Sequence, residues 1–137
     1  MTTVALRAAC LALLVISASC QSNPAPRDTA KPQAEERVTH VVLLWLKTPG
    51  DAAARTKIIE TSKTFASIPG VVSVTSGRVL PSTRPVVDSS YDVGILITFT
   101  DEAALRAYDG HPTHRKAVDE VLKPLVGKFV VFDFTSR

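Results

Sequence analysis

The chain has 137 residues, the length of one ordinary domain. Hydrophobic residues make up 45% of it and charged residues 21%, a balance that excludes a largely disordered chain. The net charge is only +3, and the basic residues are neither clustered nor interleaved with aromatic ones. That pattern argues against a nucleic-acid-binding surface. We therefore expect one folded domain and no nucleic-acid partner.

Residues 1–19 have the pattern of a secretory signal peptide. Arg7 precedes an uncharged apolar run over residues 8–16, which is shorter than the ~20 residues that span a bilayer. Small residues at 17–19 lead to Cys20. This stretch resembles the lipobox of bacterial lipoproteins, although Ser17 stands where leucine is usual. The resemblance implies that Cys20 is lipidated and becomes the N-terminus.

The remainder of the N-terminal region supports an anchored protein. No cysteine follows Cys20, so the mature domain can form no internal disulfide, and lipid attachment gives this residue a role. The alternative is a plain signal peptide cleaved beside an incidental cysteine. Residues 20–37 combine the lipidated cysteine with a polar, proline-containing flexible tether. We expect an exported protein on the periplasmic or cell-surface side of a bacterial membrane.

The folded domain is expected over residues 38–137, and its first half reads as strand, helix, strand. Residues 38–47 are apolar on both alternating faces, which indicates a strand covered on both sides. A helix follows, with Asp51 as N-cap and Pro69-Gly70 at its end. Its inward stripe is predicted to be Ala54, Ile58, Thr61, Phe65 and Ile68. Residues 71–80 form the second strand.

The second half reads as strand, helix junction, strand. After a loop over residues 81–90, residues 91–99 alternate as a strand, with Gly94 leaving room for a side chain or ligand near the backbone. A helix is predicted to start at Thr100-Asp101-Glu102, with Thr100 as cap, and to end at Gly110 as the residue after the helix. Pro112 opens the next helix, and residues 128–134 form the last strand. The stripe of that last helix comprises His114, Val118, Val121 and Leu125, and Pro124 blurs its end.

This order of elements predicts an α+β fold of the ferredoxin-like type, with a four-stranded antiparallel sheet and both helices on one face. The other face of the sheet would then be open to water. Because the first strand is apolar on both faces, we expect a second copy of the chain to cover the open face, giving a homodimer.

From residue 38 to residue 134 the chain resembles the stress-responsive dimeric α/β-barrel (Dabb) family. The resemblance rests on several short motifs taken together: residues 39–44 of the first strand, Ile68-Pro69-Gly70-Val71, Tyr91-Asp92, Thr98-Phe99, Ala107-Tyr108 followed by His111-Pro112-Thr113-His114, and Val131-Phe132-Asp133-Phe134. It implies ferredoxin-like subunits that dimerise sheet-to-sheet into a barrel.

The resemblance also implies a site. In the best-defined enzyme of the family, a plant polyketide cyclase, the catalytic tyrosine and histidine match Tyr108 and His114, and a pocket histidine matches His40. That enzyme needs neither metal nor organic cofactor, so no cofactor is expected here. His111 and Trp45 are weaker ligand-binding candidates.

The residue types suit such chemistry. A neutral imidazole at His114 can take a proton from a carbon next to a carbonyl, and the Tyr108 hydroxyl can donate to the developing enolate. His40 would position either group. The alternative is that Tyr108 and His114 are amphipathic core residues that only hold the helix junction.

Other polar residues carry less information. His111 and His114 are three apart, but His111 precedes Pro112 and is expected to be extended, so no metal site is predicted. A backbone hydrogen bond that closes the junction is the expected role of His111. Asp133 interrupts an apolar strand, where it would pair with a base on the dimer face or mark the sheet edge. Arg84 and Asp88 would pair with each other or rim the pocket.

Three functions remain open. The first is an exported, lipid-anchored homodimer that binds a small apolar or carbonyl-containing molecule. The second is a cofactor-free cyclase- or lyase-like enzyme with His114 as general base and Tyr108 as hydrogen-bond donor. The third is a non-catalytic structural or stress-response dimer whose interior is filled by side chains.

Overall fold

The computed structural model of the chain describes residues 36–136. These residues all belong to one compact unit. The predicted signal peptide, Cys20 and most of the predicted tether lie outside the described residues. Among residues 36–136, no helix is both long enough and apolar enough to cross a membrane.

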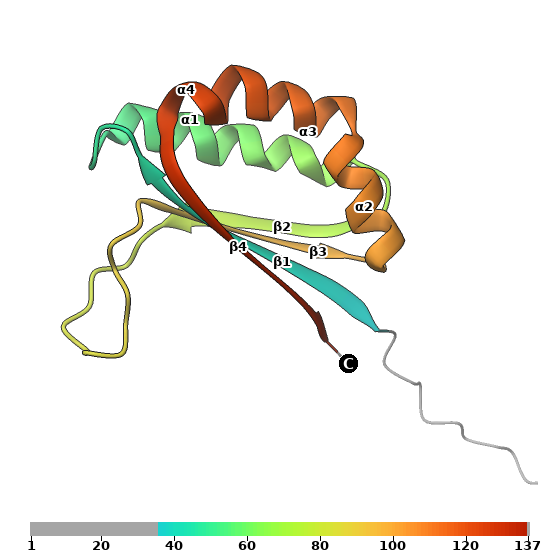
Figure 1. Ribbon diagram of the computed structural model, residues 1–137, viewed down its shortest axis with the longest axis horizontal. Helices are drawn as coiled ribbons and strands as arrows, with labels where there is room; N and C mark the ends of the chain where they lie inside the picture. The colour runs from blue at the N-terminus through green and yellow to red at the C-terminus, as the bar shows by residue number, and fades with distance from the viewer. Residues whose placement is uncertain (1–35, 137) are drawn as a thin grey trace, which may run out of the picture. The chain divides into compact units, whose positions relative to one another are not determined.

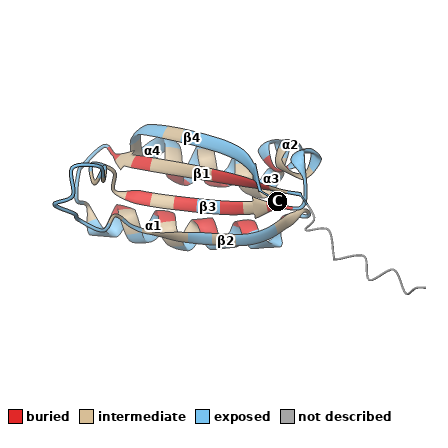
Figure 2. Ribbon diagram, turned by 90° about the horizontal axis from the view of Figure 1, so that it is seen from below, coloured by how far each residue is buried: buried red, intermediate tan, exposed pale blue. Residues whose placement is uncertain are grey.

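The four strands form one antiparallel sheet in the order β2-β3-β1-β4. Their bounds are Arg37–Leu46 for β1, Val71–Arg78 for β2, Val93–Phe99 for β3 and Val126–Ser136 for β4. All the helices lie on one face of this sheet (Figure 1). Seen from the opposite side, the strands stand in front of the helices and no described segment covers them (Figure 2). The predicted ferredoxin-like arrangement is confirmed.

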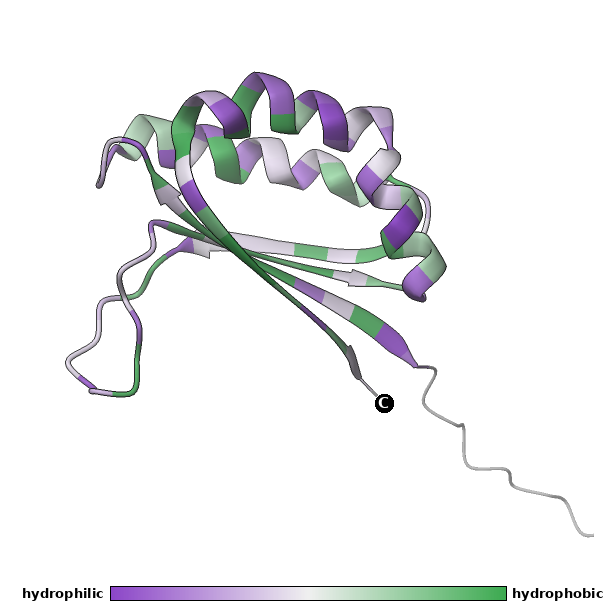
Figure 3. Cartoon of the chain, in the orientation of Figure 1, coloured by the Kyte–Doolittle hydropathy of each residue, from purple (hydrophilic) through white to green (hydrophobic). Residues whose placement is uncertain are grey.

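The core lies between the helices and the helix-facing side of the sheet. The even-numbered residues of β1 and the odd-numbered residues of β3 point to this side, because side chains alternate along a strand. Figure 3 shows hydrophobic and hydrophilic residues alternating along the helices. The residues buried here include Leu44, Leu46, Ile58, Phe65, Val93, Ile95, Ile97, Phe99 and Tyr108.

The first helix, α1, spans Ala52–Lys63 and continues as a 3-10 turn over Thr64–Ser67. Asp51 caps it as predicted, with a side-chain oxygen that accepts from the Ala53 and Ala54 amides at 2.9 and 3.0 Å. The buried stripe differs from the prediction at one position, because Ser62 is buried in place of Thr61. The Ser62 hydroxyl tolerates burial because it bonds Ile59 O and Ser76 Oγ, both at 2.8 Å.

The turn after this helix needs the glycine found there. Gly70 has a φ of +85°, and a Cβ at this position would lie 2.4 Å from the Cβ of Ala104. Only glycine combines that backbone conformation with so close an approach. The Gly70 carbonyl in turn accepts from the Thr100 amide at 3.0 Å, which ties the end of the first helix to the start of the second.

The second helix, α2, spans Glu102–Gly110, and both of its predicted ends are corrected. Asp101 rather than Thr100 is the N-cap, because its carboxylate reaches the Ala104 amide at 2.8 Å. Gly110 is still helical and has no positive φ, so it is not a left-handed stop. The helix ends at His111, whose amide donates to Tyr108 O at 3.0 Å.

The last helical segment is continuous but changes its hydrogen-bonding pattern. It comprises α3 (Pro112–Ala117), a π-helical turn over Val118–Leu122, and α4 (Lys123–Leu125). The Lys123 amide donates to Val118 O, five residues back, and Pro124 has no amide proton to donate. Pro124, near the predicted end of the helix, therefore accounts for the π-helical turn before it.

The third strand begins later than predicted, at Val93. Asp92 is drawn into a tight connection, because its carboxylate accepts from the Leu46 amide at 2.9 Å and from the Gly50 amide at 3.0 Å. This single side chain joins the β2–β3 loop to the turn between β1 and α1. The Tyr91 ring packs against Gly94, where a Cβ would lie 3.6 Å from an edge carbon of the ring.

Candidate functional site

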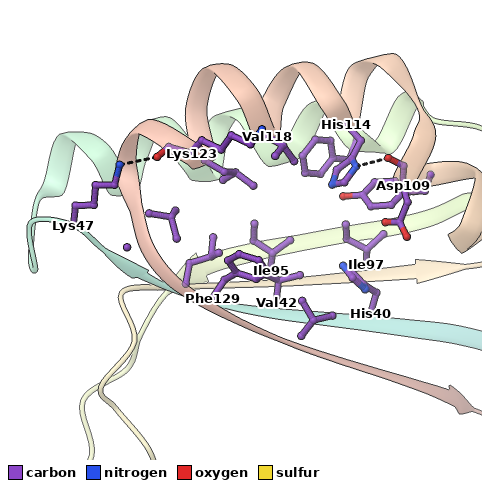
Figure 4. Close-up of a pocket in the computed structure, with 17 residues that line it drawn as sticks. His40, Val42, Lys47, Ile95, Ile97, Asp109, His114, Val118, Lys123 and Phe129 are labelled. Atoms are coloured by element: carbon purple, nitrogen blue, oxygen red, sulfur yellow. Dashed lines mark hydrogen bonds between the residues drawn. The ribbon is translucent and has the colours of Figure 1, made fainter.

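A cavity of about 620 Å³ lies between the helix layer and the sheet (Figure 4). Its wall is mainly aliphatic and aromatic, and its polar groups lie toward the two ends. The lining residues are His40, Val42, Leu44, Lys47, Phe65, Ile95, Ile97, Tyr108, Asp109, His114, Val118, Leu122, Lys123, Val126, Gly127, Phe129 and Val131. The interior is therefore not filled by side chains, and the cavity has the size of an ordinary small-molecule site.

Tyr108, in the last turn of α2, contributes a buried ring and a free hydroxyl. The residue is only 2% exposed, and its ring packs edge-on against Phe65 and Phe99. Its hydroxyl has no hydrogen-bond partner within residues 36–136, yet it is not among the buried unsatisfied atoms, so it meets the cavity. Burial raises the pKa of Tyr108, and the nearby Asp109 carboxylate raises it further. The phenol therefore stays protonated and can donate a hydrogen bond.

His114, on the first turns of α3, lies against Tyr108. Their ring centroids are 4.2 Å apart and their planes are tilted by 33°. The Nδ1 atom of His114 is 3.2 Å from the backbone oxygen of Asp109. A carbonyl oxygen only accepts hydrogen bonds, so this contact places the proton on Nδ1. In the neutral ring, Nε2 then keeps its lone pair for a partner in the cavity.

His40, on the helix-facing side of β1, completes this end of the cavity. Its ring lies edge-on to Tyr108 at 6.1 Å between centroids. Its Nδ1 donates to an Asp133 carboxylate oxygen at 2.6 Å, and the side chains are 11% and 48% exposed. A carboxylate partner holds the imidazole in one orientation with a proton on Nδ1, and in the neutral ring Nε2 is then the acceptor.

The partner of His40 was missed by the sequence reasoning. Asp133 lies on β4, an edge strand, so one of its two predicted positions, the sheet edge, is confirmed. It does not lie on the open face, because it is directly across from His40 in the β1–β4 ladder and faces the same side of the sheet. A register assignment for the last strand would have found this pair, but no local pattern provides one.

Two weaker candidates lie outside the cavity. Trp45 is an odd-numbered residue of β1 and lies on the open face, where it contacts Tyr91, Ser90 and Lys128. Strand alternation therefore separates it from His40, and Trp45 does not line this cavity. His111 does not line the cavity either. Its Nδ1 accepts from the Thr113 amide at 3.2 Å, which is the junction-closing bond expected for it.

The remaining polar residues do not add to the site. Within residues 36–136 there is no group of three or more side chains that could hold a metal ion. Arg84 and Asp88 neither line the cavity nor form an ion pair with each other. The Asp88 carboxylate accepts from the Ser90 amide at 2.8 Å, and hydrogen bonds from Ser90 lower the pKa of Asp88.

Together, His40, Tyr108 and His114 present one protonated hydroxyl and two imidazole nitrogens to a single end of the cavity. Figure 4 shows the His40 ring rising from the sheet and the His114 ring descending from the helix layer toward the same space. Such a set can hold a carbonyl or hydroxyl oxygen, and a neutral imidazole beside it can move a proton.

Comparisons with known proteins agree with this architecture. The family model of the stress responsive A/B barrel domain (Dabb) matches residues 38–136. No curated protein matches the chain. A Dabb family protein of Mesorhizobium loti with a ferredoxin-like fold is 26% identical, with a TM-score of 0.61, and the match covers 74% of this chain and 98% of that one.

Two further solved structures are similar. A dimeric ferredoxin-like protein of unknown function from a Jannaschia species is 26% identical, with a TM-score of 0.58. The match covers 72% of this chain and 97% of that one. A hydroxynitrile lyase from Passiflora edulis is 19% identical, with a TM-score of 0.64. The match covers 75% of this chain and 95% of that one. At that identity the lyase shows the fold alone.

These solved proteins consist almost wholly of the matched domain, so in them the domain is folded without long further segments. The family model extends over most of the chain and over every strand of the sheet. The chain therefore belongs to the stress responsive A/B barrel (Dabb) family.

Proposed function

We propose that the cavity binds a small, mostly apolar organic molecule through a carbonyl or hydroxyl group placed between His40, Tyr108 and His114. The observation that carries this proposal is the Tyr108 hydroxyl, which has no hydrogen-bond partner within residues 36–136 although its ring is buried. A polar group without a partner beside an open apolar cavity is suited to a ligand that brings the missing acceptor.

The binding test uses three neutral probes of similar size: acetophenone, 1-phenylethanol and ethylbenzene. Titrations of residues 36–137, followed by NMR, should show that the ketone and the alcohol bind more tightly than the hydrocarbon. Tyr108→Phe should weaken ketone binding by about threefold to tenfold, because one hydrogen bond is worth ~0.5–1.5 kcal/mol. Ethylbenzene binding should be unchanged.

Tyr91→Phe is the matched control, since Tyr91 is the only other tyrosine of the chain and does not line the cavity. It should leave the affinity for the ketone unchanged. If none of the probes binds, or if both substitutions weaken the ketone equally, the cavity is not a ligand site and the purely structural function is favoured.

A second function is proton-transfer chemistry without a cofactor on a carbonyl compound. The Nδ1 contacts of His114 and His40 favour it, because each leaves Nε2 as a potential base. In this scheme His114 takes a proton from the carbon next to the carbonyl. The electron pair moves onto the carbonyl oxygen, and Tyr108 donates a hydrogen bond to the resulting enolate. The hydroxynitrile lyase described above shows that this fold supports an enzyme.

Proton abstraction can be measured before the natural substrate is known. In deuterated water, wild-type protein should accelerate deuterium incorporation into the methyl group of acetophenone, and mass spectrometry would follow it. His114→Asn should reduce that rate by at least tenfold, since general-base catalysis contributes ~10²–10⁴-fold. His111→Asn is the control and should leave the rate unchanged, because asparagine is a favourable N-cap whose side-chain oxygen can accept from the Thr113 amide in place of the imidazole. An unchanged rate in His114→Asn would exclude the base role while leaving ligand binding intact.

We also propose that two copies associate through the open face of the sheet. This face carries apolar residues on three neighbouring strands, and Phe132 and Phe134 remain 55% and 52% exposed in the single chain. The members of this face include Val41, Leu43, Leu96, Val130, Phe132 and Phe134. Exposed apolar faces of this extent indicate a partner, and the similar Jannaschia protein is dimeric.

Sedimentation of residues 36–137 at micromolar concentration should give the mass of a dimer. Phe132→Glu should shift the protein to monomer, because it places a charge in the apolar interface. Lys57→Glu, on the exposed side of α1, is the control and should remain dimeric. A wild-type monomer at that concentration would refute the proposal.

Finally, we propose that the mature protein is exported and anchored by lipid on Cys20. The proposal rests on the sequence pattern of the first 20 residues. In a bacterial host, Cys20→Ala should abolish labelling with a fatty-acid analogue and release the protein from the membrane fraction. Cys10→Ala, which changes the other cysteine of the chain, should leave both unchanged. Membrane binding that survives Cys20→Ala without labelling would contradict the anchor.

A further inference from the structure

We infer that the ligand of this cavity is an amphipathic acid, whose anionic group lies at Lys47 and whose apolar body extends toward His40, Tyr108 and His114. This inference rests on the proposed ligand-binding function, because it concerns the same cavity. It adds the chemical class of the ligand and the direction in which it lies.

The two ends of the cavity carry opposite charges. Asp109 lines the end formed by Tyr108 and His114, and the Asp133 carboxylate lies behind His40 at 2.6 Å. The lining residues at the other end include Lys47 and Lys123. Figure 4 shows these lysines and the histidines at opposite ends of the cavity. A ligand carboxylate would be repelled by the acidic end and attracted to the lysine end.

Lys47 is the cation available to a ligand. The Lys123 ammonium is already paired with Asp119, at 2.7 Å between Nζ and Oδ1. The Lys47 ammonium donates only to the backbone oxygen of Lys123, at 2.8 Å, and no carboxylate of residues 36–136 lies within ion-pair distance of it. An ammonium has three donors, so two remain for an anionic group at the mouth of the cavity.

The separation of the ends indicates an elongated ligand. His40 and Lys47 are seven positions apart on and just beyond β1, which corresponds to roughly 20 Å of extended strand. The wall between them is apolar and comprises Val42, Leu44, Val118, Leu122, Val126 and Phe129. An alkyl or aryl chain with an acid at one end fits this sequence of environments. A compact polar metabolite would leave the apolar wall in contact with water.

Lys47 also has a structural role that must be separated from the proposed one. Its amide donates to Leu125 O at 2.9 Å and its ammonium to Lys123 O, so it caps the end of the last helix. A cation is favourable at a helix C-terminus. A cap alone would make Lys47 important for stability, but it would not make the cavity prefer an acid to a neutral molecule of the same shape.

The experiment compares a fluorescent fatty acid, dansylaminoundecanoic acid, with its methyl ester in titrations of residues 36–137 at low salt. Wild-type protein should bind the acid about threefold to fivefold more tightly than the ester, the range expected for one solvent-accessible ion pair. The preference should decline as salt is added. Lys47→Gln should abolish the preference, and Lys47→Arg should retain it. Lys57→Gln, on the outer side of α1, should leave the preference unchanged.

The outcomes distinguish this inference from the function on which it rests. Equal binding of acid and ester by wild-type protein overturns the inference, as does a Lys47→Gln variant that weakens both probes alike. In either case the ketone titration with Tyr108→Phe still tests ligand binding by itself. Failure of both dansyl probes to bind also overturns the inference, and failure of the neutral aromatic probes as well overturns the proposed function. Circular dichroism of Lys47→Gln establishes that the variant is folded.

Discussion

The site depends on the junction between α2 and α3, because this junction holds Tyr108 and His114 against each other. The His111 amide closes one helix on Tyr108 O, and the His111 imidazole accepts from the first turn of the next helix. Pro112 supplies the backbone angle that starts this helix. The chain therefore turns within a few residues, and the rings of two side chains six positions apart lie against each other at a tilt.

The same junction explains why residues that build the fold also furnish the chemistry. The Tyr108 ring is part of the core, packed against Phe65 and Phe99, while its hydroxyl reaches the cavity. Burial raises the pKa of Tyr108 and keeps it a donor. Below it, the sheet contributes His40, oriented by Asp133. The helix junction and the strand ladder thus present their polar groups to one space, which positions them for recognition of a ligand.

The two faces of the sheet have separate roles. The helix-facing side holds the core and the cavity, whereas the opposite side carries Trp45 and the exposed Phe132 and Phe134 of β4. In the proposed dimer the second copy would cover the opposite face, and each cavity would remain within its own subunit. Ligand binding and dimerisation are then distinct properties, and a substitution on one face of the sheet tests one of them without altering the other.

By itself, the sequence determined the order of the elements and the family, and through the family resemblance it predicted His40, Tyr108 and His114 at one end of the cavity. These features depend on local patterns, such as strand alternation around His40 and the Gly110–Pro112 junction between the helices. Alternation alone also separates Trp45 from His40. Tertiary structure decided the rest, because it depends on which distant residues meet. The pairing of His40 with Asp133 joins positions 93 residues apart through the β1–β4 register. The open cavity and the position of Lys47 at its far end likewise arise from how the helix layer lies over the sheet, which no short stretch of the chain encodes.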